Sequence, residues 1–193
     1  SAASDVYKRQ TEALAETNER LRLSLQQGQD IYNQAPCGYH SVNAKGVFEL
    51  VNQTELDWMG RRLDEVVGRL SIRDVFRQEP GQSLDDKLRE IIRNGRIEPF
   101  EIGLRRVDGS YRTVLVSSKA VYDAQGLFLH TNSTLVDITE RKSAELALRE
   151  NQRFLQAITD HVPGMIAYLD PMLRYRFANV EHQLSLIHIS EPT

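Results

Sequence analysis

Three strand-like stretches between residues 100 and 138 constrain the fold more than any other feature of the sequence. In the first, an apolar residue stands at every second position from Phe100 to Leu104, which predicts one buried and one solvated face. Asp108-Gly109 predicts a tight hairpin into a second strand at 111–122. A turn at 123–126 leads to a third strand at 127–138. Consecutive strands joined by short turns pair antiparallel, so this part of the chain is expected to form a meander.

A shorter hairpin and several helical pieces precede the meander. The hairpin joins residues 39–43 to residues 47–51 through a turn that contains Gly46. The predicted helices lie at 53–59, 63–67, 72–76 and 83–93, with Ser83 as a suitable N-cap of the last and Asn94-Gly95 as its end. This order predicts an α+β domain, a five-stranded antiparallel sheet with short helices inserted between strands two and three. The helices can cover one face of the sheet and leave a small-molecule cavity beneath them.

Helical stretches flank the domain on both sides, at residues 11–30 and 139–161. Each carries a narrow seam with alternating spacings of four and three: Leu14, Asn18, Leu21 and Leu25 in the first, and Ala144, Leu148, Asn151, Leu155 and Ile158 in the second. Such seams favour two-stranded coiled coils, and therefore a homodimer through the flanking helices. For each helix an alternative stays open, namely an amphipathic helix that packs on its own domain.

The two ends of the chain can be encoded by codons that are reverse complements of each other. The codons GAT-GTG-TAT-AAG-AGA-CAG encode Asp5 to Gln10, and their reverse complement encodes the run from Leu184 to Ile189. Unrelated protein segments have little reason to share this property, so residues 1–10 and 184–193 resemble a translated adaptor from a sequencing library. Natural disordered tails are the alternative. We therefore leave both segments out of the fold prediction.

The start of the domain recurs later in the chain. Ile31 to Asn52 aligns without a gap to Ile158 to Asn179, at an offset of 127 residues (163 − 36, between the two matching prolines). The predicted organisation is a linker helix at 11–30, a domain at 31–138, a linker helix at 139–161 and the truncated start of a second domain at 162–183. A domain cut off after its first hairpin cannot close a core of its own.

Composition excludes several classes of function. Hydrophobic residues make up 40% and charged residues 26% of the sequence, which is typical of a soluble globular protein. A net charge of −3 without any block of Lys or Arg argues against a nucleic-acid-binding surface. Cys37 is the one cysteine, which excludes an internal disulfide and a multi-cysteine zinc site and favours a reducing, cytoplasmic compartment. No apolar run is long enough to span a membrane, although a longer parent protein can be membrane-anchored.

Four motifs carry a resemblance to the PAS family with its C-terminal PAC motif. They are Ala35-Pro36-Cys37-Gly38-Tyr39, the stretch from Asn52-Gln53-Thr54 through Trp58-Met59-Gly60 to Glu65-Val66-Val67-Gly68, the hairpin Arg105-Arg106-Val107-Asp108-Gly109-Ser110, and Asp137-Ile138-Thr139-Glu140-Arg141-Lys142. The resemblance implies a PAS fold and a sensory, dimerising module that passes signals from its sheet into the helix that follows. It also implies an output domain in a longer protein, as in bacterial sensor histidine kinases and cyclic-dinucleotide signalling enzymes.

The same resemblance places the signal-transmission junction at Asp137 and Thr139, whose side chains can also serve simply as helix caps.

Two other functions stay open: a small-molecule-binding receptor domain, and a protein-interaction module of a transcriptional regulator. A P-loop, a phosphate-accepting histidine motif and a Gly-Gly-Asp-Glu-Phe-like run are absent from the sequence, so we expect no catalytic residues in it.

Cofactor chemistry is disfavoured by the residues present. Asn151 to Gln156 imitates the motif of flavin-binding relatives, but Gln152 stands where the reactive thiol belongs. The predicted helix at 83–93 lacks the histidine that haem-binding relatives use. His40 and His130 fall on neighbouring predicted strands, and we interpret them as ordinary strand histidines rather than metal ligands. The expected lining of the cavity is aromatic: Tyr39, Trp58, Phe76 and Phe100. An unknown small ligand remains compatible with this lining.

Overall fold

A computed structural model describes residues 2–77, 83–161, 164 and 166–179 of the chain. The chain divides into two structural units, Ser1–Thr139 and Glu140–Thr193. The predicted adaptor segment at 184–193 lies outside the described residues, as do residues 162, 163, 165 and 180–183 of the predicted second domain. Among the described residues, no helix combines the length and the apolar character needed to cross a bilayer.

The first unit contains an antiparallel sheet of five strands in the order β2-β1-β5-β4-β3. The strands are β1 (Gly38–Val42), β2 (Phe48–Val51), β3 (Arg96–Arg105), β4 (Tyr111–Tyr122) and β5 (Phe128–Asp137). The meander β3-β4-β5 forms as the turn signals predicted, and β5 then pairs with β1, which brings the two hairpins into one sheet. The predicted α+β fold is confirmed.

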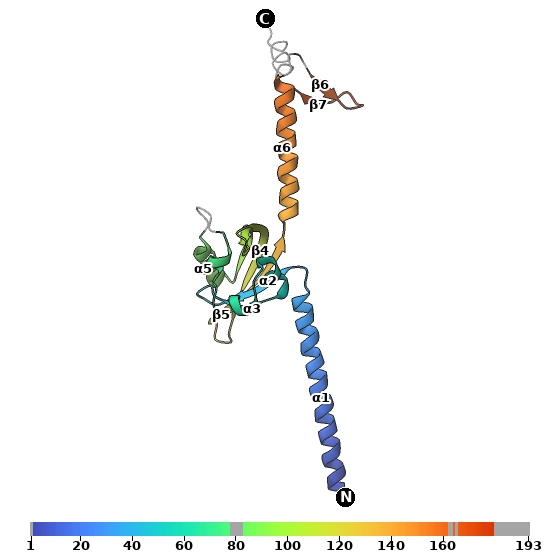
Figure 1. The fold of residues 1–193 in the computed structure, drawn as a ribbon, viewed down its shortest axis with the longest axis vertical. Helices are drawn as coiled ribbons and strands as arrows, with labels where there is room; N and C mark the ends of the chain where they lie inside the picture. The colour runs from blue at the N-terminus through green and yellow to red at the C-terminus, as the bar shows by residue number, and fades with distance from the viewer. Residues whose placement is uncertain (1, 78–82, 162–163, 165, 180–193) are drawn as a thin grey trace. The chain divides into compact units, whose positions relative to one another are not determined.

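Four short helices connect β2 to β3: α2 (Gln53–Met59), α3 (Leu63–Val66), α4 (Ile72–Val75) and α5 (Leu84–Asn94). The side chain of Ser83 accepts a hydrogen bond from the backbone N–H of Asp86, and Gly95 ends α5 in the left-handed conformation. Both ends of this helix were predicted from those two residues. Figure 1 shows the helices grouped beside the sheet within this unit.

The hydrophobic core lies between these helices and one face of the sheet. Its fully buried side chains come from both layers and include Phe48, Met59, Val66, Leu104, Val114 and Leu135. The turn before β2 needs a glycine, because Gly46 has a φ of +78° and a Cβ there would lie 3.1 Å from Cγ1 of Ile72. The hairpin therefore packs closely against α4.

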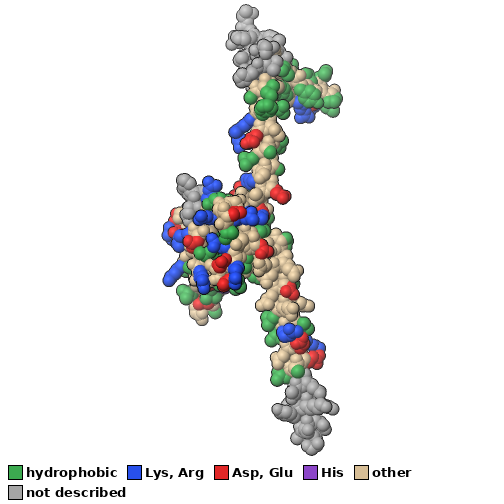
Figure 2. Space-filling view, in the orientation of Figure 1, with side chains coloured by type: hydrophobic (Ala, Val, Ile, Leu, Met, Phe, Trp, Pro, Cys, Tyr) green, Lys and Arg blue, Asp and Glu red, His purple; other side chains and the backbone are tan. Residues whose placement is uncertain are grey.

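One long helix precedes the strands of the sheet along the chain and another follows them. The first, α1 (Ala2–Asn33), begins earlier than the predicted 11–30, so the backbone of residues 2–10 continues the same helix. The second, α6 (Thr139–His161), matches the predicted linker helix. In the second unit α6 leads to a hairpin of β6 (Ala167–Leu169) and β7 (Tyr175–Ala178). Figure 2 shows apolar side chains exposed along the described turns of both long helices.

Candidate functional site

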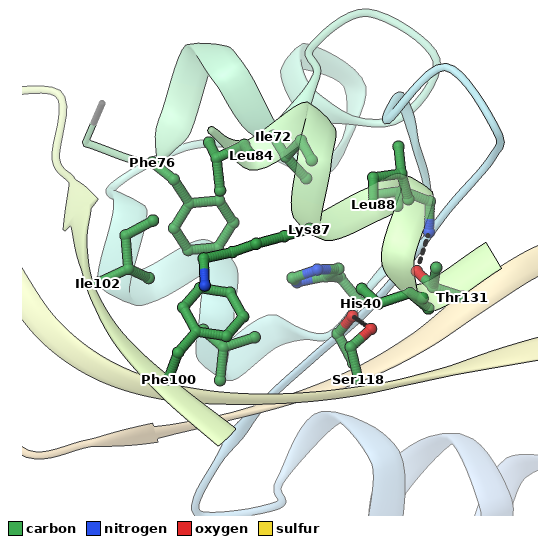
Figure 3. A pocket seen from close by; sticks show the side chains of 14 residues that line it. His40, Ile72, Phe76, Leu84, Lys87, Leu88, Phe100, Ile102, Ser118 and Thr131 are labelled. Carbon is green, nitrogen blue, oxygen red and sulfur yellow. Dashed lines mark hydrogen bonds between the residues drawn. The ribbon is translucent and has the colours of Figure 1, made fainter. Parts of the chain in front are cut away.

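A pocket of about 40 Å³ lies between the helices and the inner face of the sheet. From the helical side it is lined by Ile72 and Phe76 of the α4 segment (Figure 3) and by three apolar residues of α5, namely Leu84, Leu88 and Ile91. From the sheet, Phe100, Ile102 and Val116 complete an apolar wall. The amphipathic pattern of α5 and the alternation along β3 direct these side chains to the same space.

A polar strip crosses this apolar wall. The hydroxyls of Ser118 on β4 and Ser133 on β5 are hydrogen-bonded to each other at 2.8 Å, since the two residues are partners in the β4–β5 ladder. Thr131 Oγ1 accepts a hydrogen bond from the backbone N–H of Val42 at 3.4 Å. All three hydroxyl side chains are buried and line the pocket. Figure 3 shows two of them, Ser118 and Thr131. At the pocket's edge, Lys87 of α5 places its Nζ 3.9 Å from the ring centroid of Phe100.

His40 joins this strip and is backed by a buried carboxylate. Its Nδ1 lies 2.9 Å from Oε1 and 3.1 Å from Oε2 of Glu55, and the exposed fractions of the two side chains are 3% and 0%. The carboxylate fits because residue 38 is glycine: a Cβ there would lie 3.2 Å from Glu55 Oε2 and 3.2 Å from Leu135 Cβ. The His40 ring also meets the ring of Phe48 edge-on at 5.0 Å.

Sequence reasoning missed Glu55. A carboxylate in the first turn of a short helix is normally explained by the helix dipole, which gives no hint that the side chain is buried. The sequence does hold one signal of this burial: Glu55 is next to Leu56 and one helical turn before Met59, and both neighbours form the apolar face of α2.

The predicted cavity residues lie in three different places. Phe76 and Phe100 line the pocket. Trp58 is half-buried, packs against the core cluster and lies outside the pocket lining. The placement of Tyr39 in the cavity is wrong, because successive strand residues point to opposite faces and its neighbour His40 occupies the inner face. Tyr39 instead pairs with Tyr32 of α1 at a ring separation of 6.0 Å, and a hydrogen bond with Cys37 raises the pKa of its phenol.

His40 and His130 lie on opposite faces of the sheet. His40 pairs with Ser133 across β1–β5, whereas His130 pairs with Val121 across β4–β5 at a register position that alternates with Thr131 and Ser133. Within the described parts of the chain, no group of three or more His, Cys, Asp or Glu side chains is placed to hold a metal ion.

The end of β5 is fastened to β4 by side chains. Arg112 forms an ion pair with Asp137, and the other carboxylate oxygen of Asp137 accepts hydrogen bonds from the Thr139 hydroxyl at 2.6 Å and the Thr139 N–H at 2.9 Å. The backbone N–H of Thr113 donates to the Thr139 hydroxyl at 3.0 Å. Burial raises the pKa of Asp137, but the hydrogen bonds from Thr139 and the charge of Arg112 outweigh it and leave that pKa below its ordinary value.

This junction lies on the same two strands, β4 and β5, that supply the polar strip of the pocket. It consists of Arg112, Thr113, Asp137 and Thr139. On β5, Ser133 and Asp137 are four positions apart and so lie on the same face of the strand. On β4, Ser118 and Arg112 are likewise separated by an even number of positions. The side chains between them, Val114, Val116 and Leu135, are buried in the core. The polar strip and the junction are thus joined by one packed pair of strands. Arg112 also lies over the Trp58 ring, 5.9 Å from its centroid.

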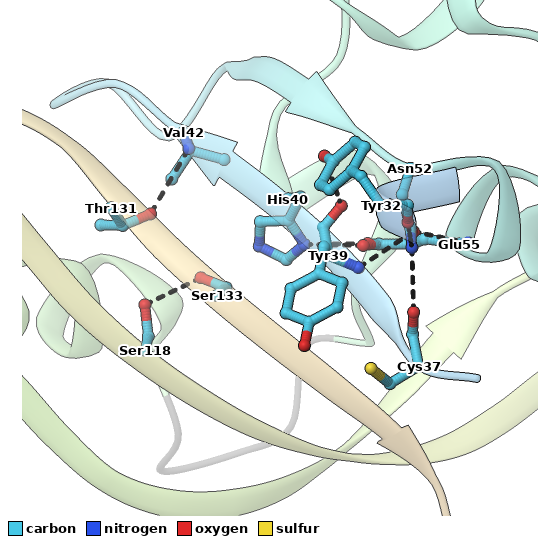
Figure 4. A network of polar contacts seen from close by, with 10 residues as sticks. All are labelled: Tyr32, Cys37, Tyr39, His40, Val42, Asn52, Glu55, Ser118, Thr131 and Ser133. Atoms are coloured by element: carbon cyan, nitrogen blue, oxygen red, sulfur yellow. Dashed lines mark hydrogen bonds and ion pairs between the residues drawn. The ribbon is translucent and has the colours of Figure 1, made fainter. Parts of the chain in front are cut away.

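The side chain of Asn52 ties the end of α1 to the start of the domain. Its Oδ1 accepts from the N–H of Tyr39 at 3.0 Å and of Glu55 at 3.1 Å. Its Nδ2 donates to the carbonyls of Tyr32 at 2.9 Å and Cys37 at 3.0 Å. Asn52 is fully buried and uses all the hydrogen-bonding capacity of its amide (Figure 4).

The second unit repeats this arrangement at the same offset. The Nδ2 of Asn179 donates to the carbonyls of Thr159 at 3.0 Å and Gly164 at 2.9 Å, and its Oδ1 accepts from the N–H of Ile166 at 3.0 Å. Each of these residues lies 127 positions after its counterpart around Asn52 (179 − 52). The sequence alignment matched the two asparagines, whereas their hydrogen-bonding role became visible only in the structure.

Comparison with known proteins gives the family. A family profile described as PAS fold matches residues 32–143. The PAS domain of an HTR-like protein from Haloarcula marismortui is 25% identical, with a TM-score of 0.51 over 68% of this chain and 99% of that one. A domain of a sensory box sensor histidine kinase/response regulator from Geobacter sulfurreducens is 19% identical, with a TM-score of 0.50 over 61% of this chain and 96% of that one. A search of curated proteins found no match. The fold, together with the match of the family profile to more than half of the chain, shows that the chain belongs to the PAS family.

Proposed function

We propose that the chain is a sensory and dimerisation module that relays changes in its pocket through β4 and β5 into α6. In the full protein α6 would pass the signal to an output domain, as in a sensor histidine kinase or a cyclic-dinucleotide signalling enzyme. The observation that carries the proposal is that one pair of strands holds both the polar strip of the pocket and the junction at the start of α6. The module itself carries no catalytic step.

The junction is suited to pass on small movements of the strands. Thr139 is held by hydrogen bonds to residues of both strands, Asp137 of β5 and Thr113 of β4. A slide of one strand against the other therefore strains these bonds directly. Hydrogen bonds that involve a charged group are short and directional, so a strained bond re-aims the first turn of the helix rather than stretching freely.

A double-variant experiment tests the relay. Thr131→Val removes a hydroxyl from the pocket wall with little change in shape, and Arg112→Gln breaks the junction ion pair. We expect Thr131→Val to shift the amide NMR resonances of Ile138 and Thr139 in the full chain, and to shift them at most half as far in the Arg112→Gln background. Arg105→Gln, an exposed arginine on the adjacent strand β3, is the matched control. Equal shifts in both backgrounds would exclude transmission through Arg112.

We also propose that the module forms a homodimer through its flanking helices. The seam residues Leu148 and Leu155 of α6 have exposed fractions of 60% and 61%, and Leu21 on α1 is 58% exposed. Burial of one leucine contributes about 1.5–3 kcal/mol, so these seams favour association with a second copy. We expect Leu148→Glu with Leu155→Glu to weaken self-association by at least about a hundredfold in sedimentation. Leu146→Glu changes an equally exposed leucine outside the seam and is the control; an unchanged association state in the double variant would contradict the coiled coil.

A small-molecule receptor is the second candidate, favoured by the buried polar strip. At about 40 Å³ the pocket is far smaller than the roughly 300–1,000 Å³ of sites for drug-sized ligands, so we propose that neither flavin nor haem occupies it. An absorption spectrum and a native mass of the purified chain test this. A bound chromophore would reverse the assignment, whereas a tightly held colourless ligand would favour the receptor.

We further propose that residues 162–183 begin a second PAS domain. The support is the Asn179 network, which matches the hydrogen bonds of Asn52 bond for bond at three of four partners. In that case α6 is both the exit helix of one domain and the lead-in helix of the next, so a relay through α6 would reach a second sensor before the output.

A further inference from the structure

The geometry points to a short-chain aliphatic monocarboxylate as the class of ligand that the pocket accepts. This inference deepens the sensory role proposed above and rests on it. It follows from three properties of the pocket: the charge state of the His40–Glu55 pair, the hydrogen-bonding direction of the polar strip, and the volume available.

The first property is the buried pair. Glu55 has no exposed surface, and His40 Nδ1 is its one hydrogen-bond partner among the described side chains. A buried net charge costs far more than a neutral pair, so burial favours the state in which the two groups together carry no charge. That state holds one proton between the carboxylate and Nδ1 and a second proton on Nε2. Figure 4 shows this second ring nitrogen on the side of the ring away from Glu55, toward Ser133 and Thr131, and Figure 3 shows His40 among the residues that line the pocket. His40 therefore offers the pocket an N–H donor.

The second property is the direction of the remaining polar groups. One hydroxyl proton of the Ser118–Ser133 pair is used between the two oxygens, and the other is left for the pocket. Thr131 accepts from Val42, which leaves its own proton to donate. Lys87 contributes an ammonium group whose recorded partner is the Phe100 ring. No carboxylate lines the pocket in the part of the chain that the structure describes. The lining therefore offers several hydrogen-bond donors and no group that can only accept a hydrogen bond. It selects a ligand that accepts hydrogen bonds and carries negative charge.

The third property is size. A volume of about 40 Å³ holds roughly three water molecules at about 10–15 Å³ each, and thus a ligand of only a few heavy atoms. The walls around the polar strip are aliphatic and aromatic, so the rest of the ligand is apolar. The alkyl chains of acetate, propionate and butyrate have one to three carbons and so fit this volume, while the carboxylate reaches Lys87 at the edge of the pocket. The carboxylate would lie between Lys87 and the polar strip, with the alkyl chain against the apolar residues of α5.

The test is a titration of the full chain followed by amide NMR, with propionate as the probe. Propylamine has the same length and opposite charge, and octanoate has the same charge and excessive length; both serve as control ligands. We expect saturable shifts at Ser118, Thr131 and Ser133 with propionate and none with propylamine. Lys87→Gln should weaken propionate binding about tenfold, as expected for one charge-assisted hydrogen bond at a half-exposed site. Arg93→Gln removes the same charge from an exposed position on the same helix and should leave the affinity unchanged.

The outcomes separate this inference from the relay. Saturable shifts in the pocket without shifts at Ile138 and Thr139 would uphold the ligand class and overturn the relay. No saturable response to any short carboxylate, or an equal response to propylamine, would overturn the ligand class and leave the relay to the Thr131→Val experiment. Tighter binding of octanoate than of butyrate would also overturn it, because the pocket would then select length rather than a small anion.

Discussion

The bonds of Asn52 make a quantitative prediction about stability. Asn52→Asp keeps the shape of the side chain and the oxygen that accepts from Tyr39 and Glu55, and aspartate is as good an N-cap for α2 as asparagine. It replaces the Nδ2 group, which donates to the carbonyls of Tyr32 and Cys37, with an oxygen that repels them. Each buried hydrogen bond lost in this way costs about 1–3 kcal/mol. We therefore expect a loss of about 2–6 kcal/mol for the two bonds together, from a total stability of about 5–15 kcal/mol.

The assay is urea unfolding followed by tryptophan fluorescence. Trp58 is the one tryptophan of the chain and packs against the core of the first unit, so it reports the unfolding of that unit alone. Asn179→Asp is the matched control, because it makes the same change in the equivalent network of the second unit. We expect that control to leave the Trp58 transition unchanged. The reasoning is refuted if Asn52→Asp costs less than about 1 kcal/mol, or if Asn179→Asp shifts the transition as far.

Two further predictions concern backbone geometry and pH. Gly46→Ala should destabilise the first unit by about 1–2 kcal/mol in the same urea assay, because it forces an alanine into a positive φ and a methyl group against Ile72; an unchanged midpoint would show that the turn relaxes freely. The pKa of Asp137 is lowered in the folded protein, so its contribution to the free energy of unfolding is fully present above the ordinary aspartate pKa of about 4 and is lost as pH falls below that value. Asp137→Asn should therefore flatten the acid limb of a pH–stability profile, and a limb identical to that of the unsubstituted chain would contradict this.

Local signals in the sequence determined most of the architecture. The turn at Asp108-Gly109 and the cap at Ser83 act over a few residues, so the end of β3, the start of β4 and the start of α5 followed from chemistry near each boundary. The start of β3 did not, because the strand begins at Arg96, before the alternation predicted from Phe100. The order of the elements then left an antiparallel sheet with inserted helices as the expected fold. The Asn52–Asn179 alignment, likewise, needed only the sequence and a constant offset.

Tertiary structure decided which side chains form the site. Alternation along a strand fixes which residues share a face, but it does not say which face is covered. In β1 the burial pattern does not identify the covered face, because residues on both faces are buried: Ser41 lies on the same face as Tyr39 and is buried as fully as His40 and Val42, which lie on the opposite face. Tyr39 was therefore placed on the wrong side, and Glu55 was overlooked because its burial depends on Gly38 and His40, distant in sequence. A charged residue is buried only where a partner and space are both supplied by other segments, and no local pattern carries that information.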